Sequence, residues 1–186
     1  MAQQNNARNI IMMHGYICSL KSTVAKRLAE KMGLPRLETK QLGAIASETD
    51  KTWRYRLLST IVKNYAHGET DFIVDGTFGK KTFREAIYRL GDEASTGDVV
   101  VVRCICEDDH EIWKRIKGRK ENEDVCILEW ANRKHDVIEC DKYRNAMPSL
   151  IEVDTKNFAV RPINARSDFS RKVAESLTEI VNSLKK

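Results

Sequence analysis

The chain has 186 residues, of which 41% are hydrophobic and 32% charged, with a formal net charge of +5. Proline and glycine number only 3 and 9, which excludes a disordered chain and favours one globular domain over residues 1–186. No apolar run approaches the roughly 18 residues of a membrane span, and the polar first ten residues do not resemble a secretion signal.

Apolar runs alternate with helical patterns along the whole chain. Strands are predicted at about 9–14, 35–39, 71–75, 98–106 and 150–153, and helices at about 21–32, 50–66, 81–94, 108–118, 124–142 and 166–184. Strands separated by helices of this length indicate βαβ units and a parallel sheet covered on both faces. We therefore expect an α/β protein with three layers, α/β/α, around a central, mostly parallel five-stranded sheet. The charged link near 118–126 and its flanking helices predict a small helical lid over 115–142.

Five cysteines are scattered along the sequence, and only Cys104 and Cys106 lie close together. No second Cys/His pair has the spacing of a zinc site. An odd, scattered set is typical of reduced thiols that pack as small hydrophobic side chains, which favours a cytoplasmic protein.

The segment HGYICSLKST, residues 14–23, begins where the first strand ends. A phosphate-binding P-loop has the form G-x-x-x-x-G-K-S/T, and Gly15, Lys21 and Ser22 occupy three of its four defined positions. In such a loop backbone N–H groups bind phosphate oxygens, the lysine contacts the β- and γ-phosphates, and the serine hydroxyl ligates Mg²⁺. The predicted nucleotide-binding residues are Gly15, Ile17, Cys18, Ser19, Leu20, Lys21, Ser22 and Thr23. The alternative is an ordinary strand–turn–helix connection in which Lys-Ser-Thr occurs by chance.

Leu20 stands where the second glycine of the loop belongs. If this position requires a positive φ, leucine costs about 1–2 kcal/mol in backbone strain. If its φ and ψ are helical, the cost reduces to crowding beside the phosphates.

Three segments, in this order, resemble those of the P-loop small kinases: HGYICSLKST, FIVDGTFGKKTFREAIYRL and RCICEDDHEIWKRIKGRK. This group includes gluconate kinase, chloramphenicol phosphotransferase, zeta toxin and the 5′-kinase domain of polynucleotide kinase. The resemblance covers most of the chain. It implies a P-loop fold like that of nucleoside and shikimate kinases, and transfer of the γ-phosphoryl group of ATP, with Mg²⁺, to a hydroxyl group.

The resemblance also implies roles for single residues. Asp75, at the end of a buried strand, matches the acidic residue that holds Mg²⁺ or its water shell, although a turn or N-cap aspartate is the alternative. Arg115 and Arg119 lie four residues apart and match the lid arginines that neutralise charge on the transferring phosphate. The alternative for this pair is a solvated basic helix end.

The sequence departs from these kinases after the second strand. Lys40 and Gly43 occupy the aspartate and arginine positions of their S-T-D-x-x-R element. A protonated lysine cannot accept the proton of a substrate hydroxyl, but it suits a negatively charged acceptor. Glu38, or else Asp75, is then the expected catalytic base.

The segment VDTKNFAVRP, residues 153–162, lacks the N-K-x-D element that recognises guanine, which favours ATP. Arg161 is predicted to stack on the purine, and an ordinary surface arginine is the alternative. Three functions remain open: a small-metabolite or nucleotide kinase, a nucleic-acid 5′-hydroxyl kinase, and a nucleotide-binding switch with little transfer activity. The absence of an aromatic platform disfavours nucleic acid, whereas Leu20 and Lys40 favour the switch.

Overall fold

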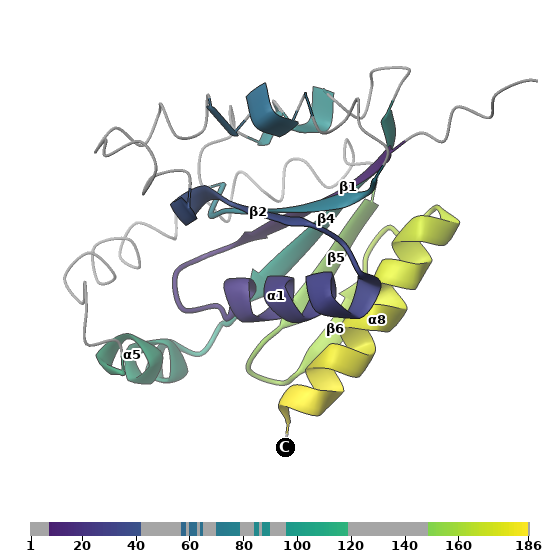
Figure 1. Cartoon of the computed structure of the whole chain (residues 1–186). Helices are drawn as coiled ribbons and strands as arrows, with labels where there is room; N and C mark the ends of the chain where they lie inside the picture. Colours follow the sequence, from purple (N-terminus) through teal and green to yellow (C-terminus); the bar gives the residue numbers. More distant parts are fainter. Residues whose placement is uncertain are drawn as a thin grey trace, which may run out of the picture.

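The computed structural model describes residues 8–41, 57–58, 60–62, 64, 70–78, 84–85, 87–89, 96–118 and 149–185. Its centre is a six-stranded sheet with the strand order β2-β3-β1-β4-β5-β6 (Figure 1). The strands are β1 (Arg8–Gly15), β2 (Arg36–Glu38), β3 (Phe72–Asp75), β4 (Thr96–Ile105), β5 (Ser149–Asp154) and β6 (Ala159–Pro162). The first five are parallel, as predicted, and β6 runs antiparallel to β5.

The sheet thus has one strand more than the five predicted. The extra strand, β6, is four residues long, half-buried to exposed, and lies at the edge of the sheet. It ends at Pro162, a residue that sheets accept at an edge because proline lacks an N–H donor. A strand this short and this exposed gives no strong alternation of apolar residues, so the sequence pattern did not reveal it.

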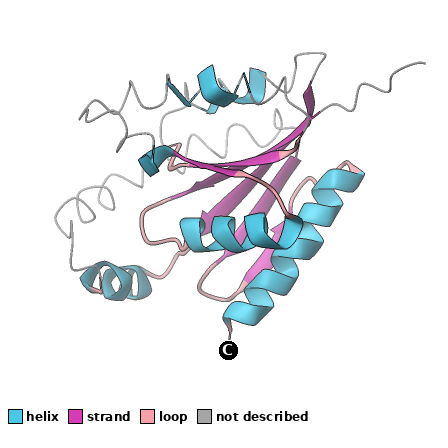
Figure 2. Ribbon diagram, viewed as in Figure 1, coloured by secondary structure: helices cyan, strands magenta, loops and turns pink. Residues whose placement is uncertain are grey.

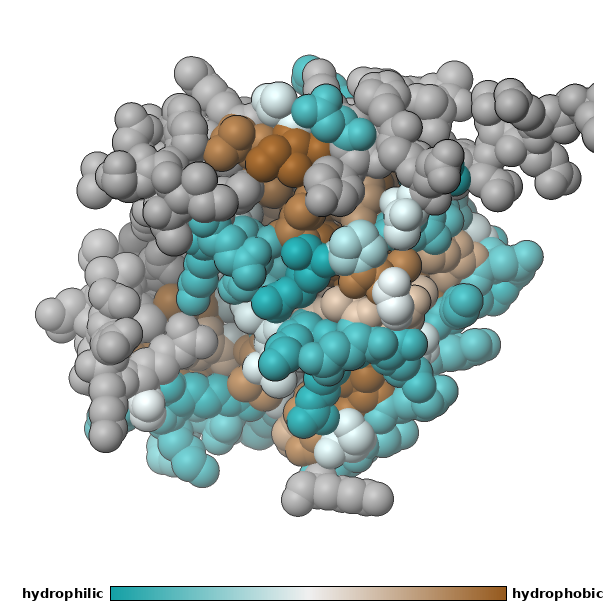
Figure 3. Space-filling model, viewed as in Figure 1, coloured by the Kyte–Doolittle hydropathy of each residue, from teal (hydrophilic) through white to brown (hydrophobic). Residues whose placement is uncertain are grey.

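Helices α1 (Lys21–Met32) and α8 (Asp168–Leu184) cover one face of the sheet (Figure 2). Val24, Ala25 and Leu28 of α1 are fully buried, which agrees with the predicted apolar stripe. Helix α8 begins with a capping box between Ser167 and Ser170. The solvent-facing surface of these two helices is hydrophilic (Figure 3).

The opposite face of the sheet carries a second core. Leu58, Val62 and Ile87, from helical segments within the predicted helices 50–66 and 81–94, pack against apolar side chains of β1, β3 and β4. The two cores on either face give the predicted three layers. Strand β1 lies between them and is buried from Ile10 to Gly15, as expected of a central parallel strand.

Helix α5 (Asp109–Lys117) follows β4 and packs through Ile112 and Ile116 against Cys18 and Cys106. The predicted helix 124–142 and the lid beyond residue 118 lie outside the described residues, so the lid stays a prediction. Within the described part of the chain, no helix is long and apolar enough to cross a membrane.

Candidate active site

The carboxyl ends of the parallel strands meet at one edge of the sheet, and the loop after β1 lies there. Gly15 at its start has φ 155°, and a Cβ atom at this position would lie 2.5 Å from the Cys104 carbonyl oxygen. The end of β1 therefore packs against β4 at a distance that only glycine permits. The loop then closes on itself, since the Ser19 hydroxyl donates to the Tyr16 carbonyl oxygen at 2.8 Å.

Two residues of the loop other than glycine adopt the left-handed conformation. Cys18 has φ 61°, and Leu20 has φ 56° and ψ 13°. Of the two alternatives for Leu20, the structure thus has the strained one, with a cost of about 1–2 kcal/mol. Leu20 is also the N-cap of α1 and makes no side-chain capping hydrogen bond. The first N–H groups of α1 are thereby left to a ligand or to water, the arrangement that binds anions at helix N-termini.

The loop lysine and the strand-end aspartate are in direct contact. Lys21 Nζ lies 3.0 Å from Asp75 Oδ1, and Asp75 is only 1% exposed. The pairing of β1 with β3, which places Met13 beside Asp75, brings them together. The glycine after Asp75 matters as well, because a Cβ at Gly76 would lie 2.8 Å from a methyl group of Thr39. The structure thus brings two of the predicted site residues, Lys21 and Asp75, into contact at one edge of the sheet.

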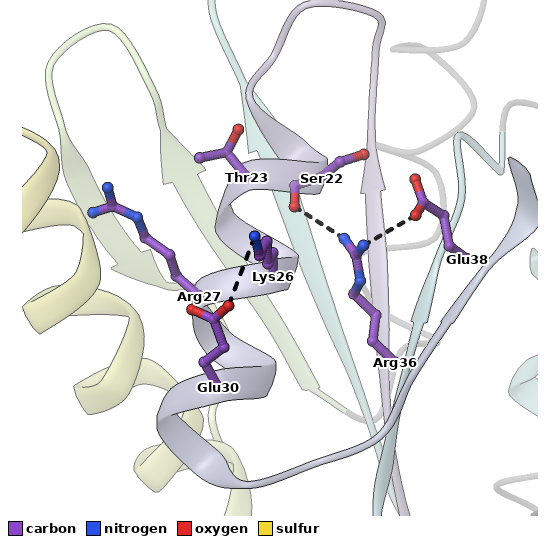
Figure 4. Close-up of a pocket in the computed structure, with 7 residues that line it drawn as sticks. All are labelled: Ser22, Thr23, Lys26, Arg27, Glu30, Arg36 and Glu38. Atoms are coloured by element: carbon purple, nitrogen blue, oxygen red, sulfur yellow. Dashed lines mark hydrogen bonds and ion pairs between the residues drawn. The ribbon is translucent and has the colours of Figure 1, made fainter. Parts of the chain in front are cut away.

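An arginine on strand β2 links Asp75 of this pair to a second carboxylate, Glu38. Glu38 is the register partner of Asp75 on the neighbouring strand β2. Arg36 lies between them, with Nη1 3.2 Å from Asp75 Oδ2 and Nη2 3.0 Å from Glu38 Oε2. Its Nη1 also donates to the Ser22 carbonyl oxygen at 3.1 Å (Figure 4). Arg36 was not predicted, although Arg-x-Glu on a strand places both side chains on one face.

A pocket of about 430 Å³ opens between α1 and β2 beside this group (Figure 4). Its lining is strongly charged and consists of Ser22, Thr23, Lys26, Arg27, Glu30, Arg36 and Glu38. Solvent and ions therefore have access to Arg36 and Glu38 from this side.

Arg115 connects α5 to the loop. Its Nη1 donates to the Cys18 carbonyl oxygen at 3.0 Å, and its Nη2 donates to the Thr155 carbonyl oxygen at 2.9 Å. Its Nε donates to Glu111 Oε1 at 2.8 Å. The described contacts of Arg115 thus brace the loop and the β5–β6 turn. Its predicted action on the γ-phosphate stays a prediction, and Arg119 lies outside the described residues.

The remaining predicted residues lie in the loop, at the start of α1, after β2 and in β6. Lys40 is exposed directly after β2. Thr23 is exposed on the first turn of α1, and Ile17 is half-buried in the loop. Arg161 lies in β6, where its guanidinium is 3.9 Å from the Asp154 carboxylate. That contact belongs to the β5–β6 hairpin rather than to the loop.

A row of buried polar side chains crosses the other face of the sheet at the same level. His14, Arg103 and Glu152 are register partners on β1, β4 and β5. Arg103 Nη1 lies 3.3 Å from Glu152 Oε2, with both side chains 8% exposed. His14 Nδ1 lies 2.8 Å from the Thr77 carbonyl oxygen. Burial, with the nearby Arg84 charge, lowers the pKa of His14 to about 3, so the imidazole is neutral near pH 7.

The cysteines in the described residues behave as predicted. Cys18, Cys104 and Cys106 are free and buried. Burial raises the pKa of the Cys104 thiol to about 12, so it stays protonated. Cys126 and Cys140 lie outside the described residues.

The site contains oxygen atoms of the kind that hold Mg²⁺ in proteins. The described residues contain no group of three or more His, Cys, Asp or Glu side chains that could enclose a metal ion. Mg²⁺ is usually held by one or two carboxylates together with substrate phosphates and water. Asp75 and Glu38, which Arg36 bridges, and the Ser22 hydroxyl in the pocket lining are oxygen donors of this kind.

Comparison with known proteins agrees with this geometry. Residues 10–134 match the model of an AAA domain family, AAA_33. No curated protein matches the chain in sequence.

Three solved structures share the fold over nearly the whole length. A gluconokinase from Sinorhizobium meliloti 1021 is 14% identical, with a TM-score of 0.53 over 96% of this chain and 95% of that one. A provisionally assigned kinase from Chloroflexus aurantiacus j-10-fl is 19% identical, with a TM-score of 0.52 over 95% and 97%. An uncharacterized protein from Eubacterium ventriosum ATCC 27560 is 15% identical, with a TM-score of 0.52 over 95% and 99%. Because the family model covers most of the sequence, and the fold and loop geometry agree with it, the chain belongs to the AAA_33 family of AAA domains, a P-loop kinase-like family.

Proposed function

We propose that this protein is an ATP- and Mg²⁺-dependent kinase that transfers the γ-phosphoryl group to a hydroxyl of a small metabolite or nucleotide. The observation that carries the proposal is the 3.0 Å contact between Lys21 and Asp75 at the head of an uncapped helix. A phosphate-binding lysine and a metal-binding carboxylate need this proximity, because both act on the same phosphate group.

Each residue of the site has a task in this proposal. The loop N–H groups and Lys21 bind the phosphates, and Lys21 exchanges its Asp75 partner for a phosphate oxygen when nucleotide enters. Ser22 and Asp75 hold Mg²⁺, which supplies charge neutralisation on the phosphates when bound. Glu38 is the residue we expect to accept the proton of the acceptor hydroxyl. Lys40, exposed just beyond β2, supports an acceptor that carries a negative charge.

A nucleotide-binding switch is the second candidate, and the backbone of Leu20 favours it. A leucine with φ 56° places a bulky side chain where the loop of an efficient kinase has glycine. Such a loop would still bind phosphates through its N–H groups, with less precise placement of the group to be transferred.

The test compares Lys21→Ala with Lys172→Ala, a control that removes an exposed lysine from α8. Thermal shift with ATP and Mg²⁺ measures nucleotide binding, and transfer of labelled γ-phosphate to a panel of metabolites measures activity. We expect Lys21→Ala to stay folded, because Arg36 still neutralises Asp75, and to lose about 100- to 1000-fold in turnover. We expect the control to behave as wild type.

Unchanged turnover in folded Lys21→Ala would rule out the proposed mechanism. Binding of ATP by the wild-type protein without transfer to any acceptor would favour the switch.

A further inference from the structure

Arg36 contacts both Asp75 and Glu38 of the candidate site. One branch of its guanidinium donates to Asp75 Oδ2 at 3.2 Å and to the Ser22 carbonyl oxygen at 3.1 Å. The other branch donates to Glu38 Oε2 at 3.0 Å. A planar guanidinium can make these three contacts at once. A lysine ammonium on its flexible stem cannot hold all three with the same geometry.

The sheet explains why these side chains meet. Glu38 and Asp75 are register partners on parallel strands, whose backbones run about 4.8 Å apart. Arg36 lies two residues before Glu38 and therefore points to the same face of the sheet, which is the face covered by α1. Without a cation between them, two carboxylates at this separation would repel each other in a largely buried environment.

The charges of the four side chains balance when no nucleotide is bound. Asp75 has a cation at each oxygen, Lys21 Nζ at 3.0 Å and Arg36 Nη1 at 3.2 Å. Together with Glu38 the set carries two positive and two negative charges. Such a site has little attraction for a free divalent cation, although its carboxylate oxygens are the ligands that Mg²⁺ prefers.

We propose that Arg36 is a positioning residue that occupies the place of a divalent cation between Asp75 and Glu38, so that the metal enters only together with the nucleotide. This inference rests on the proposed function, because it takes Asp75 as a ligand of the metal. Phosphates draw Lys21 away from Asp75 and bring the metal with them, whereas Arg36 continues to hold Glu38 in place for the acceptor. The pocket beside Arg36 and Glu38 gives ions access to the pair.

The decisive experiment measures binding of Mn²⁺ alone, without nucleotide, by the electron paramagnetic resonance signal of free Mn²⁺. Wild type is compared with Arg36→Met, which keeps the length of the side chain and removes its charge. We expect Arg36→Met to bind Mn²⁺ at least tenfold more tightly than wild type, because two carboxylates are then left with one cation. Adding Asp75→Asn to Arg36→Met should abolish the gain.

Arg27→Met is the matched control. Arg27 lines the same pocket, but its described hydrogen bond is to the Ser183 hydroxyl at 2.9 Å. Removing its charge should leave Mn²⁺ affinity within twofold of wild type. An equal gain in Arg27→Met and Arg36→Met would show a general charge effect and overturn the proposal.

A folded Arg36→Met protein, judged by circular dichroism, with unchanged Mn²⁺ affinity would also overturn it. If Arg36→Met does not fold, Arg36→Gln carries the same test, since glutamine keeps a donor and loses the charge.

A second measurement distinguishes a role of Arg36 in positioning Glu38 for catalysis from a role in stabilising the fold. In the transfer assay, Arg36→Lys should lower kcat at least tenfold with a KM for ATP·Mg within threefold of wild type. An unchanged kcat would contradict the positioning role. If the wild-type protein does not bind ATP, the proposed kinase function is wrong, but the Mn²⁺ comparison still tests the role of Arg36. Failure of the proposed function and failure of the Arg36 proposal are therefore distinguishable.

Discussion

Replacing Leu20 by glycine should relieve strain in the loop. Leu20 has φ 56° and ψ 13°, a conformation that costs an L-residue about 1–2 kcal/mol and costs glycine almost nothing. Glycine also loses about 0.5–1 kcal/mol through the greater freedom of the unfolded chain. The change additionally removes a half-buried side chain, so the fair reference is Leu20→Ala, which removes the side chain and keeps the strain.

We expect Leu20→Gly to be more stable than Leu20→Ala by about 1 kcal/mol. In a chain of this size that difference corresponds to about 2–4 °C in Tm. The measurement is the free energy of unfolding from urea denaturation of both variants, followed by circular dichroism, with Tm as a second observable.

Gly33, at the other end of the same helix, provides an independent measure of what a positive φ costs a non-glycine residue in this protein. Gly33, the C-cap of α1, has φ 66°, and a Cβ atom there would meet nothing within 4 Å. The cost of Gly33→Ala is therefore conformational alone, and we expect a loss of about 1 kcal/mol. If Gly33→Ala loses this amount while Leu20→Gly is no more stable than Leu20→Ala, the strain assigned to Leu20 is wrong.

Two further predictions concern the buried polar row. The pKa of His14 is about 3 in the folded protein and about 6.5 when unfolded, so stability should fall as pH decreases from 6.5, by up to ~1.4 kcal/mol per pH unit. In His14→Asn, which keeps a donor, that part of the slope should vanish in unfolding experiments between pH 7 and 5, and an unaltered slope would refute the assignment. Arg103→Met should lose about 3–5 kcal/mol because it leaves Glu152 buried without its partner, whereas Arg103→Met combined with Glu152→Leu should recover most of the loss. Equal stability of the single and double variants would mean that the two charges are not coupled.

Features that depend on nearby residues could be predicted from the sequence. The apolar stripe of α1 and its end at Gly33 are local patterns, and the helix has the predicted bounds. The five parallel strands follow from apolar runs separated by helices. The contact between Lys21 and Asp75 could also be anticipated, because strand ends of a parallel sheet share one edge.

Features that depend on strand neighbours could not be predicted in the same way. Arg36 meets Asp75 only because β2 lies beside β3 in one register, and a shift of one residue would turn Arg36 to the other face. The same holds for Arg103 and Glu152, which lie on strands separated by more than 40 residues of sequence. For Leu20, the sequence identified the conflict, but only the backbone geometry decides between strain and crowding.

The contacts of Arg115 have a consequence for how the site forms during folding. Its guanidinium donates a hydrogen bond to the carbonyl oxygen of Cys18, 97 positions earlier in the chain, and another to the carbonyl oxygen of Thr155. Bringing residues so far apart in sequence into contact costs conformational entropy of the intervening chain, and local secondary structure does not offset this cost. A nascent chain or fragment holding only β1, the loop and α1 would carry the phosphate-binding motif without the bond that braces its left-handed turn. We therefore expect the loop to reach its folded geometry late, only once β4, α5 and β5 have docked.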